Sequence, residues 1–264
     1  MAKLPTRLKQ ATAYNVDAEA LNKINDKENL TKEELDRYTV STTIETFGKE
    51  LLEDIRVIEN YPVQGVKFYD LTPALINPYF LSGIPVHMSL LIKDIDFVVA
   101  PEARGFYFGP LAATMVGAGF IPMRKRGKVP PHTFNSLITF ESKSEYGESA
   151  FQINSTAISH MKEVFLKQKQ REFDMMKEDM AADGTPALQE DTILSSNRID
   201  PSRIRVAIVD DVLATGNTAA SIIAFFESMD IKVSQFISVL EIENLKGREL
   251  IESMDVKVDS LLKV

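Results

Sequence analysis

Residues 204–218 read IRVAIVDDVLATGNT, and this stretch decides the fold class. Its first six residues are apolar apart from one arginine, a composition that is typical of a buried strand. Asp210 and Asp211 follow this run, and the small, hydroxyl-rich turn 214–218 then opens a helical stretch, 219–229, and a further strand, 233–240. Strand–helix–strand alternation of this kind predicts an α/β domain with a mostly parallel sheet.

The same stretch indicates what the sheet binds. Ligands of open α/β sheets bind at the carboxyl ends of the strands. Backbone N–H groups of the turn 215–218, together with its threonine hydroxyls, can cradle a phosphate at a helix N-terminus. The carboxylates of Asp210 and Asp211 repel a phosphate but accept hydrogen bonds from ribose hydroxyls, so the combination suggests a ribose 5-phosphate site. A plain strand end followed by a helix cap remains a second interpretation of these residues alone.

The composition excludes several classes of function. The chain has 264 residues, with 30 Lys and Arg against 38 Asp and Glu, for a net charge of −8. An acidic chain is a poor candidate for nucleic-acid binding. The absence of Cys excludes disulfides, a thiolate nucleophile and Cys-bound zinc, and three scattered His argue against a His metal site. With no apolar run of about 20 residues and no secretory signal, we expect a soluble, cytoplasmic protein that does not enter a membrane.

The segments before the phosphate-binding stretch alternate in type. Residues 1–48 are polar and contain two helical patterns, at 17–24 and after a capping signature that begins at Thr31. An amphipathic helix is predicted over 44–58 and a loop over 61–73, where Pro62 and Gly65 interrupt the chain. The following elements are a strand at 96–100, a helix at 106–116 and a strand at 119–123.

The middle of the chain predicts a hairpin followed by a long charged helix. Extended runs at 136–140 and 149–153 flank a long polar tip. Residues 161–180 are predicted to form a solvated helix with a thin apolar stripe that contains Met161, Met175, Met176 and Met180. A linker rich in helix-breaking residues follows at 181–197.

Six short motifs resemble the adenine phosphoribosyltransferase family of type I phosphoribosyltransferases, and they occur in the family's order. The stretch 209–218 is similar to the family's motif for phosphoribosyl pyrophosphate (PRPP). The others are GVKFYDLTP (65–73), similar to the adenine-binding loop; RGFYFGP (104–110), similar to the pyrophosphate loop; RKRGKVP (124–130), similar to the basic segment; EYG (145–147), similar to the tip of the catalytic flap; and LKGR (245–248), similar to the segment after the last core strand.

The resemblance implies a parallel sheet flanked by helices, with a small hood over the base and an inserted helical segment. It covers roughly residues 51–160 and 200–250. We therefore expect an N-terminal helical extension over 1–50 and a phosphoribosyltransferase domain over 51–264, with the insertion at about 161–199. The implied reaction moves a phosphoribosyl group from PRPP to adenine and gives AMP and pyrophosphate, in purine salvage. The implied cofactor is Mg²⁺, held mainly by substrate, and the implied assembly is a homodimer.

The resemblance also assigns roles to individual residues. Arg104 and Glu145 are the expected catalytic groups, the first on the departing pyrophosphate and the second as flap carboxylate at the purine. The remaining assignments are Asp210, Asp211, Ala214, Thr215, Gly216, Asn217 and Thr218 for ribose and phosphate; Arg124, Lys125 and Lys128, with Arg104, for pyrophosphate; and Phe68, Tyr69 and Leu213 for the base.

Three alternatives stay open from the sequence. Glu141 lies near Glu145 and is a second candidate for the flap carboxylate. Tyr69 stands where many relatives carry Arg, which leaves room for another purine base. A non-catalytic protein that senses PRPP is a rival of a different class, although such a protein would not need Arg104, Glu145 and Phe68 together.

Overall fold

The computed structural model describes residues 32–131, 136–144, 147–182 and 203–264. The chain divides into two compact units between Asp54 and Ile55. In the first unit, the described chain forms helix α3 (Lys32–Glu53), and the capping signature at Thr31 lies outside the described residues. The helix predicted at 17–24 lies outside the described residues.

The predicted helix over 44–58 is wrong in its second half. Helix α3 ends at Glu53, and Arg56–Glu59 form strand β1, which pairs antiparallel with strand β2 (Lys67–Asp70). Apolar residues of 44–58 fit a helical spacing, but the β-branched pair Val57 and Ile58 finds cross-strand partners in β2. Pairing with a distant segment has therefore overridden the local periodicity. Because residues 67–70 form β2, the predicted loop 61–73 is shortened to the residues between β1 and β2.

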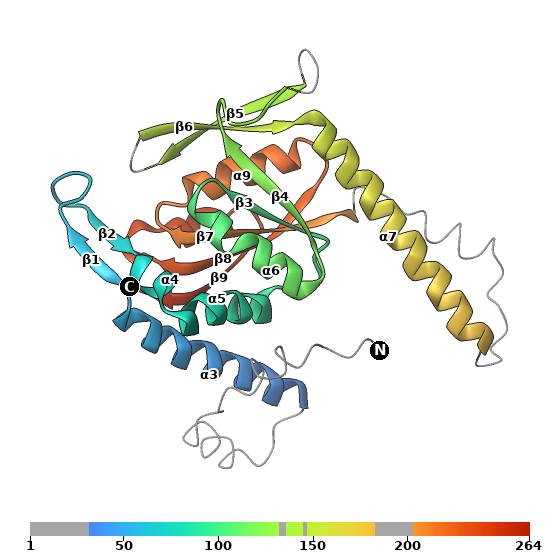
Figure 1. The fold of residues 1–264 in the computed structure, drawn as a ribbon, viewed down its shortest axis with the longest axis horizontal. Coiled ribbons are helices and arrows are strands. Elements are labelled where there is room, and N and C mark those ends of the chain that lie inside the picture. The colour runs from blue at the N-terminus through green and yellow to red at the C-terminus, as the bar shows by residue number, and fades with distance from the viewer. Residues whose placement is uncertain (1–31, 132–135, 145–146, 183–202) are drawn as a thin grey trace. The chain divides into compact units, whose positions relative to one another are not determined.

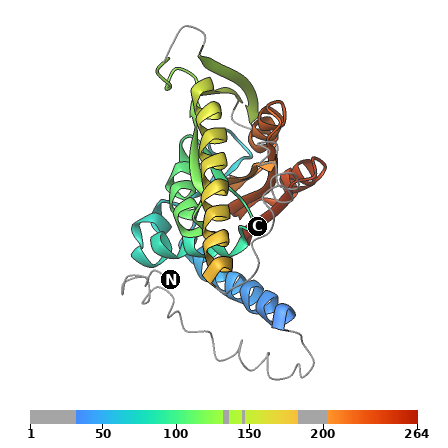
Figure 2. The same cartoon turned by 90° about the vertical axis from the view of Figure 1, so that its right-hand side faces the viewer.

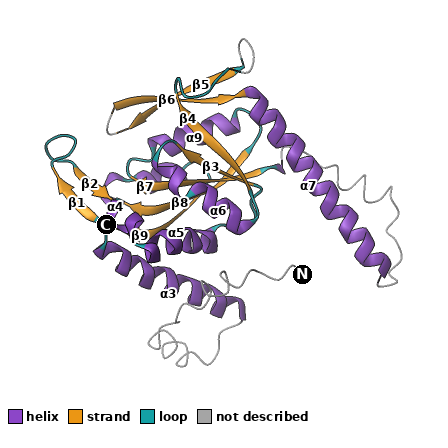
Figure 3. Cartoon of the chain, in the orientation of Figure 1, coloured by secondary structure: helices purple, strands orange, loops and turns teal. Residues whose placement is uncertain are grey.

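The second unit is built on a seven-stranded mixed sheet flanked by helices (Figure 1, Figure 3), so the predicted α/β class is confirmed. Five neighbouring strands run parallel, and a hairpin adds antiparallel to one edge. The order is β5-β6-β4-β3-β7-β8-β9. Their bounds are β3 Phe97–Pro101, β4 Gly119–Lys125, β5 Leu137–Ser144, β6 Gly147–Asn154, β7 Arg205–Leu213, β8 Lys232–Glu241 and β9 Lys257–Lys263.

The order in which strands are added to the sheet reverses at the neighbouring strands β3 and β7. From β3 the chain crosses through α6 (Gly109–Val116) to β4 on one side, and from β7 it crosses through α9 (Asn217–Glu227) to β8 on the other. Because such crossovers are right-handed, these two helices lie on opposite faces of the sheet. Figure 2 shows this: α6 with α5 (Pro78–Leu91) on one side, and α9 with α10 (Gly247–Glu252) on the other. The strand pair β3/β7 is therefore the topological switch point, where ligands bind in this class of sheet.

The hood expected over the base corresponds to the hairpin β1–β2 and the short helix α4 (Thr72–Ile76). Gly65 has a φ of 87° in the hairpin turn, and its N–H donates to the side chain of Asn60 at 2.9 Å. The turn thus needs a residue that tolerates the left-handed region. This hairpin places Phe68 at the sheet's carboxyl edge.

The flap hairpin is longer than predicted. Strands β5 and β6 pair from Leu137↔Asn154 to Ser144↔Gly147, so the expected long tip is confined to residues 145–146, which lie outside the described residues. Phe140 of β5 stacks on Phe225 of α9 with ring centroids 4.8 Å apart. This contact packs the apolar face of the hairpin against a core helix, and the added length comes from residues 141–144, which pair with residues 147–150 of β6.

Helix α7 (Ser155–Ala182) follows the hairpin and differs from the predicted insertion in both bounds and packing. Ile158, Met161 and Phe165 are buried in the core, so the first turns belong to the domain. Met175 and Met176 are exposed, and the predicted methionine stripe is not continuous. Beyond Phe165 no described residue of α7 is buried, and the helix runs away from the sheet (Figure 1).

Two further elements correct the sequence analysis. Strand β7 continues through Asp210 and Asp211 to Leu213, because β8 pairs with it as far as Glu241. At the C-terminal end, residues that seemed to lie outside the core form β9, which pairs parallel with β8. No helix in the described part of the chain is long and apolar enough to cross a membrane.

Candidate active site

A cavity of about 480 Å³ opens at the carboxyl ends of β3 and β7. Residues 101–104 line it after β3, residues 210–219 line it at the end of β7, and Phe68 closes it from the hood. The cavity therefore sits at the topological switch point and joins three motifs that are far apart in the sequence. Its volume is in the range of small-molecule sites.

Asp210 and Asp211 form a buried acidic pair near the carboxyl end of strand β7. The N–H of Asp211 donates to Oδ1 of Asp210 at 2.8 Å, and Asp211 is 3% exposed. Burial raises the pKa of both carboxyl groups, and for Asp210 the neighbouring charge of Asp211 raises it further. Among the described residues no group donates a well-aligned hydrogen bond to Oδ2 of Asp211. This oxygen faces Arg104 and can also accept a hydrogen bond from a ligand hydroxyl.

Arg104 lies between the acidic pair and the hood. Its Nε is 3.0 Å from Oδ2 of Asp211, an ion pair whose cationic partner is partly exposed. Its guanidinium also lies over the ring of Phe68, 5.4 Å from the centroid. The positive charge lowers the pKa of Asp211 against the effect of burial.

The turn after β7 has the geometry of an anion cradle. Gly216 has a φ of 78°, in the left-handed region, and stands directly before helix α9. The first N–H groups of a helix have no acceptor within it and can therefore bind an anion. Asn217 donates from its side chain to the hydroxyl of Thr215 at 3.2 Å. The structure therefore brings all of residues 214–218 to the cavity wall.

The basic segment contributes one of its three predicted residues to the cavity. Lys125 lines it, whereas Arg124 donates from Nε to Glu102 at 3.0 Å and Lys128 is exposed outside the lining. Burial acts to raise the pKa of Glu102, but hydrogen bonds from Arg124 and from the Lys125 N–H, at 2.8 Å, lower it overall. An ionised Glu102 thus joins the end of β4 to the loop after β3.

The side of the cavity that holds the residues predicted for the base is aromatic and apolar. Phe68 packs edge-on against Tyr61, with ring centroids 5.3 Å apart, and the fully buried Leu213 forms another wall. Tyr69 is not part of the lining, because successive side chains of a strand point to opposite faces. Of the three residues predicted for the base, the structure therefore brings Phe68 and Leu213 together.

The flap carboxylate stays a prediction. Glu145 lies outside the described residues, as does Tyr146. Glu141, the alternative, is exposed on β5 opposite Ala150 and is not among the residues that line the cavity.

Several lining residues were missed from the sequence. Tyr61 lies within the quoted loop region but carried no signal of its own, and Glu102 and Ala103 enter through the loop after β3. Phe151 and Phe236 also line the cavity. Their positions follow from the register of β6 and β8 in the sheet, which no local pattern reveals.

This fold and this site define a type I phosphoribosyltransferase. An adenine phosphoribosyltransferase of Clostridium novyi (strain NT) is 35% identical over 210 residues, which cover 78% of this chain and 94% of that protein. One of Methanococcus maripaludis is 31% identical over 216 residues, covering 81% and 98%. The crystal structure of the enzyme from Thermoanaerobacter pseudethanolicus aligns with a TM-score of 0.57 at 29% identity, over 82% of this chain and 99% of that one. No protein-family model matches the sequence.

A further solved structure carries ligands. The adenine phosphoribosyltransferase of Saccharomyces cerevisiae, complexed with an imino-altritol bisphosphate and adenine, aligns with a TM-score of 0.56 at 26% identity, over 82% of this chain and 99% of that one. The chain belongs to the adenine phosphoribosyltransferase family.

Proposed function

We propose that the chain transfers the 5-phosphoribosyl group of PRPP to adenine and releases AMP and pyrophosphate, as in purine salvage. The observation that carries the proposal is the cavity at the β3/β7 switch point. It joins an anion cradle, an acidic pair, an arginine and an aromatic side chain, and each suits one part of these two substrates.

The ribose phosphate is assigned to the end of β7. The N–H groups and hydroxyls of residues 215–218 suit the 5-phosphate, and the carboxylates of Asp210 and Asp211 suit the ribose hydroxyls. A ribose held in this way keeps its reacting carbon fixed relative to the loop after β3, which lowers the entropic part of the barrier.

The departing pyrophosphate is assigned to Arg104 and Lys125. Negative charge grows on this group as its bond to the ribose breaks, so cations placed in advance stabilise the transition state. Arg104 must exchange its contact with Asp211 for phosphate oxygens when PRPP binds. Arg124 and Lys128 stay predicted contacts, and Arg124 would first have to leave Glu102.

The base is assigned to the space between Phe68 and Leu213. A purine can stack on Phe68, and its ring nitrogen then faces the ribose across the cavity. Glu145 is proposed to accept or donate the proton at the purine ring as the new bond forms. Tyr69, although predicted here, would act only through its backbone.

Mg²⁺ is proposed as a companion of the substrate. Among the described residues no group of three or more His, Asp or Glu side chains is placed to hold a metal ion. The ion is proposed to be coordinated mainly by pyrophosphate oxygens and water. Bound there, the ion would neutralise part of the charge that Arg104 and Lys125 meet.

A homodimer in the cytoplasm completes the proposal. Tyr107, Leu111 and Met115 are exposed at a spacing of four residues along the 3₁₀ turn η1 (Arg104–Tyr107) and α6, which gives one apolar stripe. A stripe of this kind supports a protein interface. It begins at the pyrophosphate loop, so the interface and the site would share an element.

The test is a product assay with purified protein, Mg²⁺, PRPP and a panel of purine bases, with nucleotides separated by chromatography. The expected result is that adenine gives AMP and that no other base of the panel gives a nucleotide. Nucleotides from another base would favour the wider specificity that Tyr69 leaves open. Tight PRPP binding without product from any base would overturn the proposal in favour of a PRPP sensor.

A further inference from the structure

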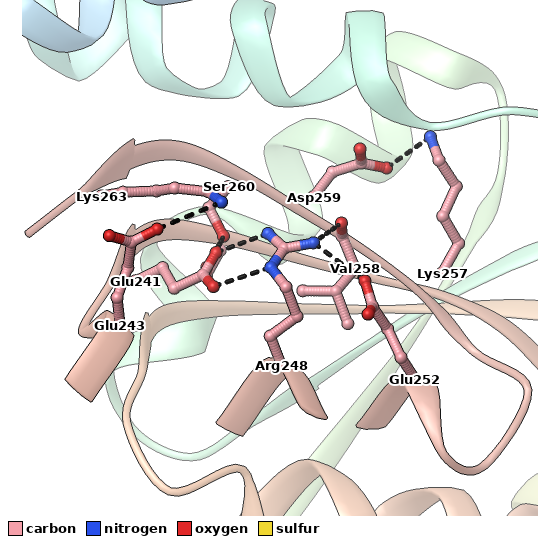
Figure 4. Close-up of polar contacts among 10 residues, drawn as sticks. Glu241, Glu243, Arg248, Glu252, Lys257, Val258, Asp259, Ser260 and Lys263 are labelled. Carbon is pink, nitrogen blue, oxygen red and sulfur yellow. Dashed lines mark hydrogen bonds and ion pairs between the residues drawn. The ribbon is translucent and has the colours of Figure 1, made fainter. Parts of the chain in front are cut away.

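A cluster of charged side chains lies at the carboxyl end of β8, outside the cavity (Figure 4). Arg248, the second residue of α10, donates from Nε and Nη2 to the two carboxylate oxygens of Glu241, at 2.8 and 2.5 Å. Its Nη1 donates to the carbonyl of Val258 at 2.6 Å and to Glu252 at 3.1 Å. The guanidinium thus ties α10 to both β8 and β9.

Glu241, whose carboxylate accepts these hydrogen bonds, is itself buried and hydrogen-bonded. Glu241 is 3% exposed, and the hydroxyl of Ser260 donates to it at 2.8 Å. Burial acts to raise the pKa of Glu241, but the hydrogen bonds from Arg248 and Ser260 lower it overall. A two-pronged contact between Arg and a buried carboxylate fixes orientation as well as distance. Arg248 therefore sets where the start of α10 lies.

The start of α10 is in direct contact with the turn 214–218, which is proposed to bind the 5-phosphate and is called the phosphate turn below. A Cβ added to Gly247 would lie 2.3 Å from the carbonyl oxygen of Ala214 and 2.8 Å from the amide nitrogen of Gly216. Seen from the other side, a Cβ on Gly216 would lie 2.8 Å from the carbonyl oxygen of Gly247. The two backbones touch at a place where only glycine fits.

A second attachment joins the same two regions. The N–H of Ile242, next to Glu241, donates to the carbonyl of Leu213 at 2.9 Å. The turn that begins at Ala214 is thus anchored at its start by the end of β8 and supported along its back by Gly247. Arg248 follows Gly247 in α10 and binds Glu241 at the end of β8, so it fixes these two segments relative to each other.

We propose that Arg248, held by Glu241, is a positioning residue for the 5-phosphate of PRPP, and that it acts through the contact of Gly247 with the phosphate turn. The proposal rests on the proposed function and refines it. A cradle of N–H groups binds a phosphate well only when its geometry is set within fractions of an ångström. Loosening α10 therefore weakens binding of the phosphorylated ribose and leaves the pyrophosphate and base regions as they are.

The experiment compares two inhibitors of the intact enzyme, each of which corresponds to one part of PRPP. In Arg248→Lys and Arg248→Gln, the inhibition constant of ribose 5-phosphate and the KM for PRPP are expected to rise about tenfold, or about 1.4 kcal/mol. The inhibition constant of pyrophosphate and the KM for adenine should change less than about twofold. Glu252→Gln is the matched control, since it removes the negative charge of one half-exposed partner of Arg248 and leaves Glu241 in place.

The outcomes separate this inference from the proposed function. If the unaltered protein makes no AMP, the proposed function has failed. If the unaltered protein is active and the Arg248 variants raise both inhibition constants equally, or neither, the positioning role is wrong. Should the Arg248 variants fold poorly in thermal melts, Gly247→Ala gives the same selective test from the opposite side of the contact. An unchanged constant for ribose 5-phosphate in a folded Gly247→Ala variant would overturn the proposal.

Discussion

Two carboxyl groups of the flap hairpin are candidates for one role at the base. We expect Glu145→Gln to lower kcat by roughly 100-fold, a typical effect of losing a group that handles a proton, with little change in the KM for PRPP. Glu141→Gln is the matched control on the exposed side of β5 and should keep kcat within about twofold. Steady-state kinetics of the two variants decides between them. The opposite pattern would assign the role to Glu141.

Asp210 illustrates a conflict between stability and binding. Burial and the charge of Asp211 raise its pKa in the folded protein. A raised pKa means that the folded state binds a proton more tightly than the unfolded chain, so ionisation destabilises the fold as the pH rises above about 4. We expect Asp210→Asn, which keeps the acceptor for the Asp211 N–H, to melt higher at pH 7 and to lose PRPP affinity.

Thermal melts of the ligand-free protein from pH 4 to pH 8 check this sign. The gain of Asp210→Asn should be largest at neutral pH and shrink as the pH falls toward about 4, where the unfolded chain also begins to hold the proton. Asp174→Asn, on the exposed part of α7, controls for the loss of one negative charge. A lower melting temperature of Asp210→Asn at pH 7 would mean that the ion pair of Arg104 with its neighbour stabilises the carboxylates more than burial opposes them.

At the scale of elements, helix α7 combines a core segment and a solvated one. Met161 is 3% exposed and Met175 is 65% exposed on the same helix. Met161→Ala should lower the free energy of unfolding by about 2–5 kcal/mol through lost burial and a cavity. Met175→Ala, the same substitution, should change it by less than about 0.5 kcal/mol. Urea unfolding curves measure both, and equal losses would mean that the second half of α7 is packed against something in solution.

Elements were predictable where local pattern and tertiary packing agree. The strand–turn–helix of residues 204–229 and the strands at 96–100 and 119–123 follow from apolar runs between breakers. The structure has all of them, although the strand predicted to end at residue 209 continues to Leu213. The predicted helix 44–58 failed because Val57 and Ile58 pair with β2. The flap strands were predicted too short, since residues 141–144 are polar and belong to the strand only through their pairing with residues 147–150.

At the scale of the whole molecule, the site is a product of chain topology. Motifs identify Asp210, Arg104 and Phe68 as candidates, and the adjacency of β3 and β7 brings them to one cavity. Local sequence does not specify that Arg104 faces Asp211 or that Arg124 turns to Glu102. Those pairings depend on strand order and register, which are set by contacts between distant segments. Tyr61 was missed for the same reason.

The proposed dimer is the last property that belongs to the molecule as a whole. Leu111 is 44% exposed at the centre of the stripe on η1 and α6. A buried glutamate without a partner is costly, so Leu111→Glu should dissociate a dimer that uses this stripe. Sedimentation velocity should find the unaltered protein at twice its chain mass of 29.6 kDa and the variant at that mass. Leu81→Glu, at an equally exposed leucine of α5, controls for added charge. If both variants stay dimeric, the interface lies elsewhere, and if the unaltered protein is a monomer, the site must be complete within one chain.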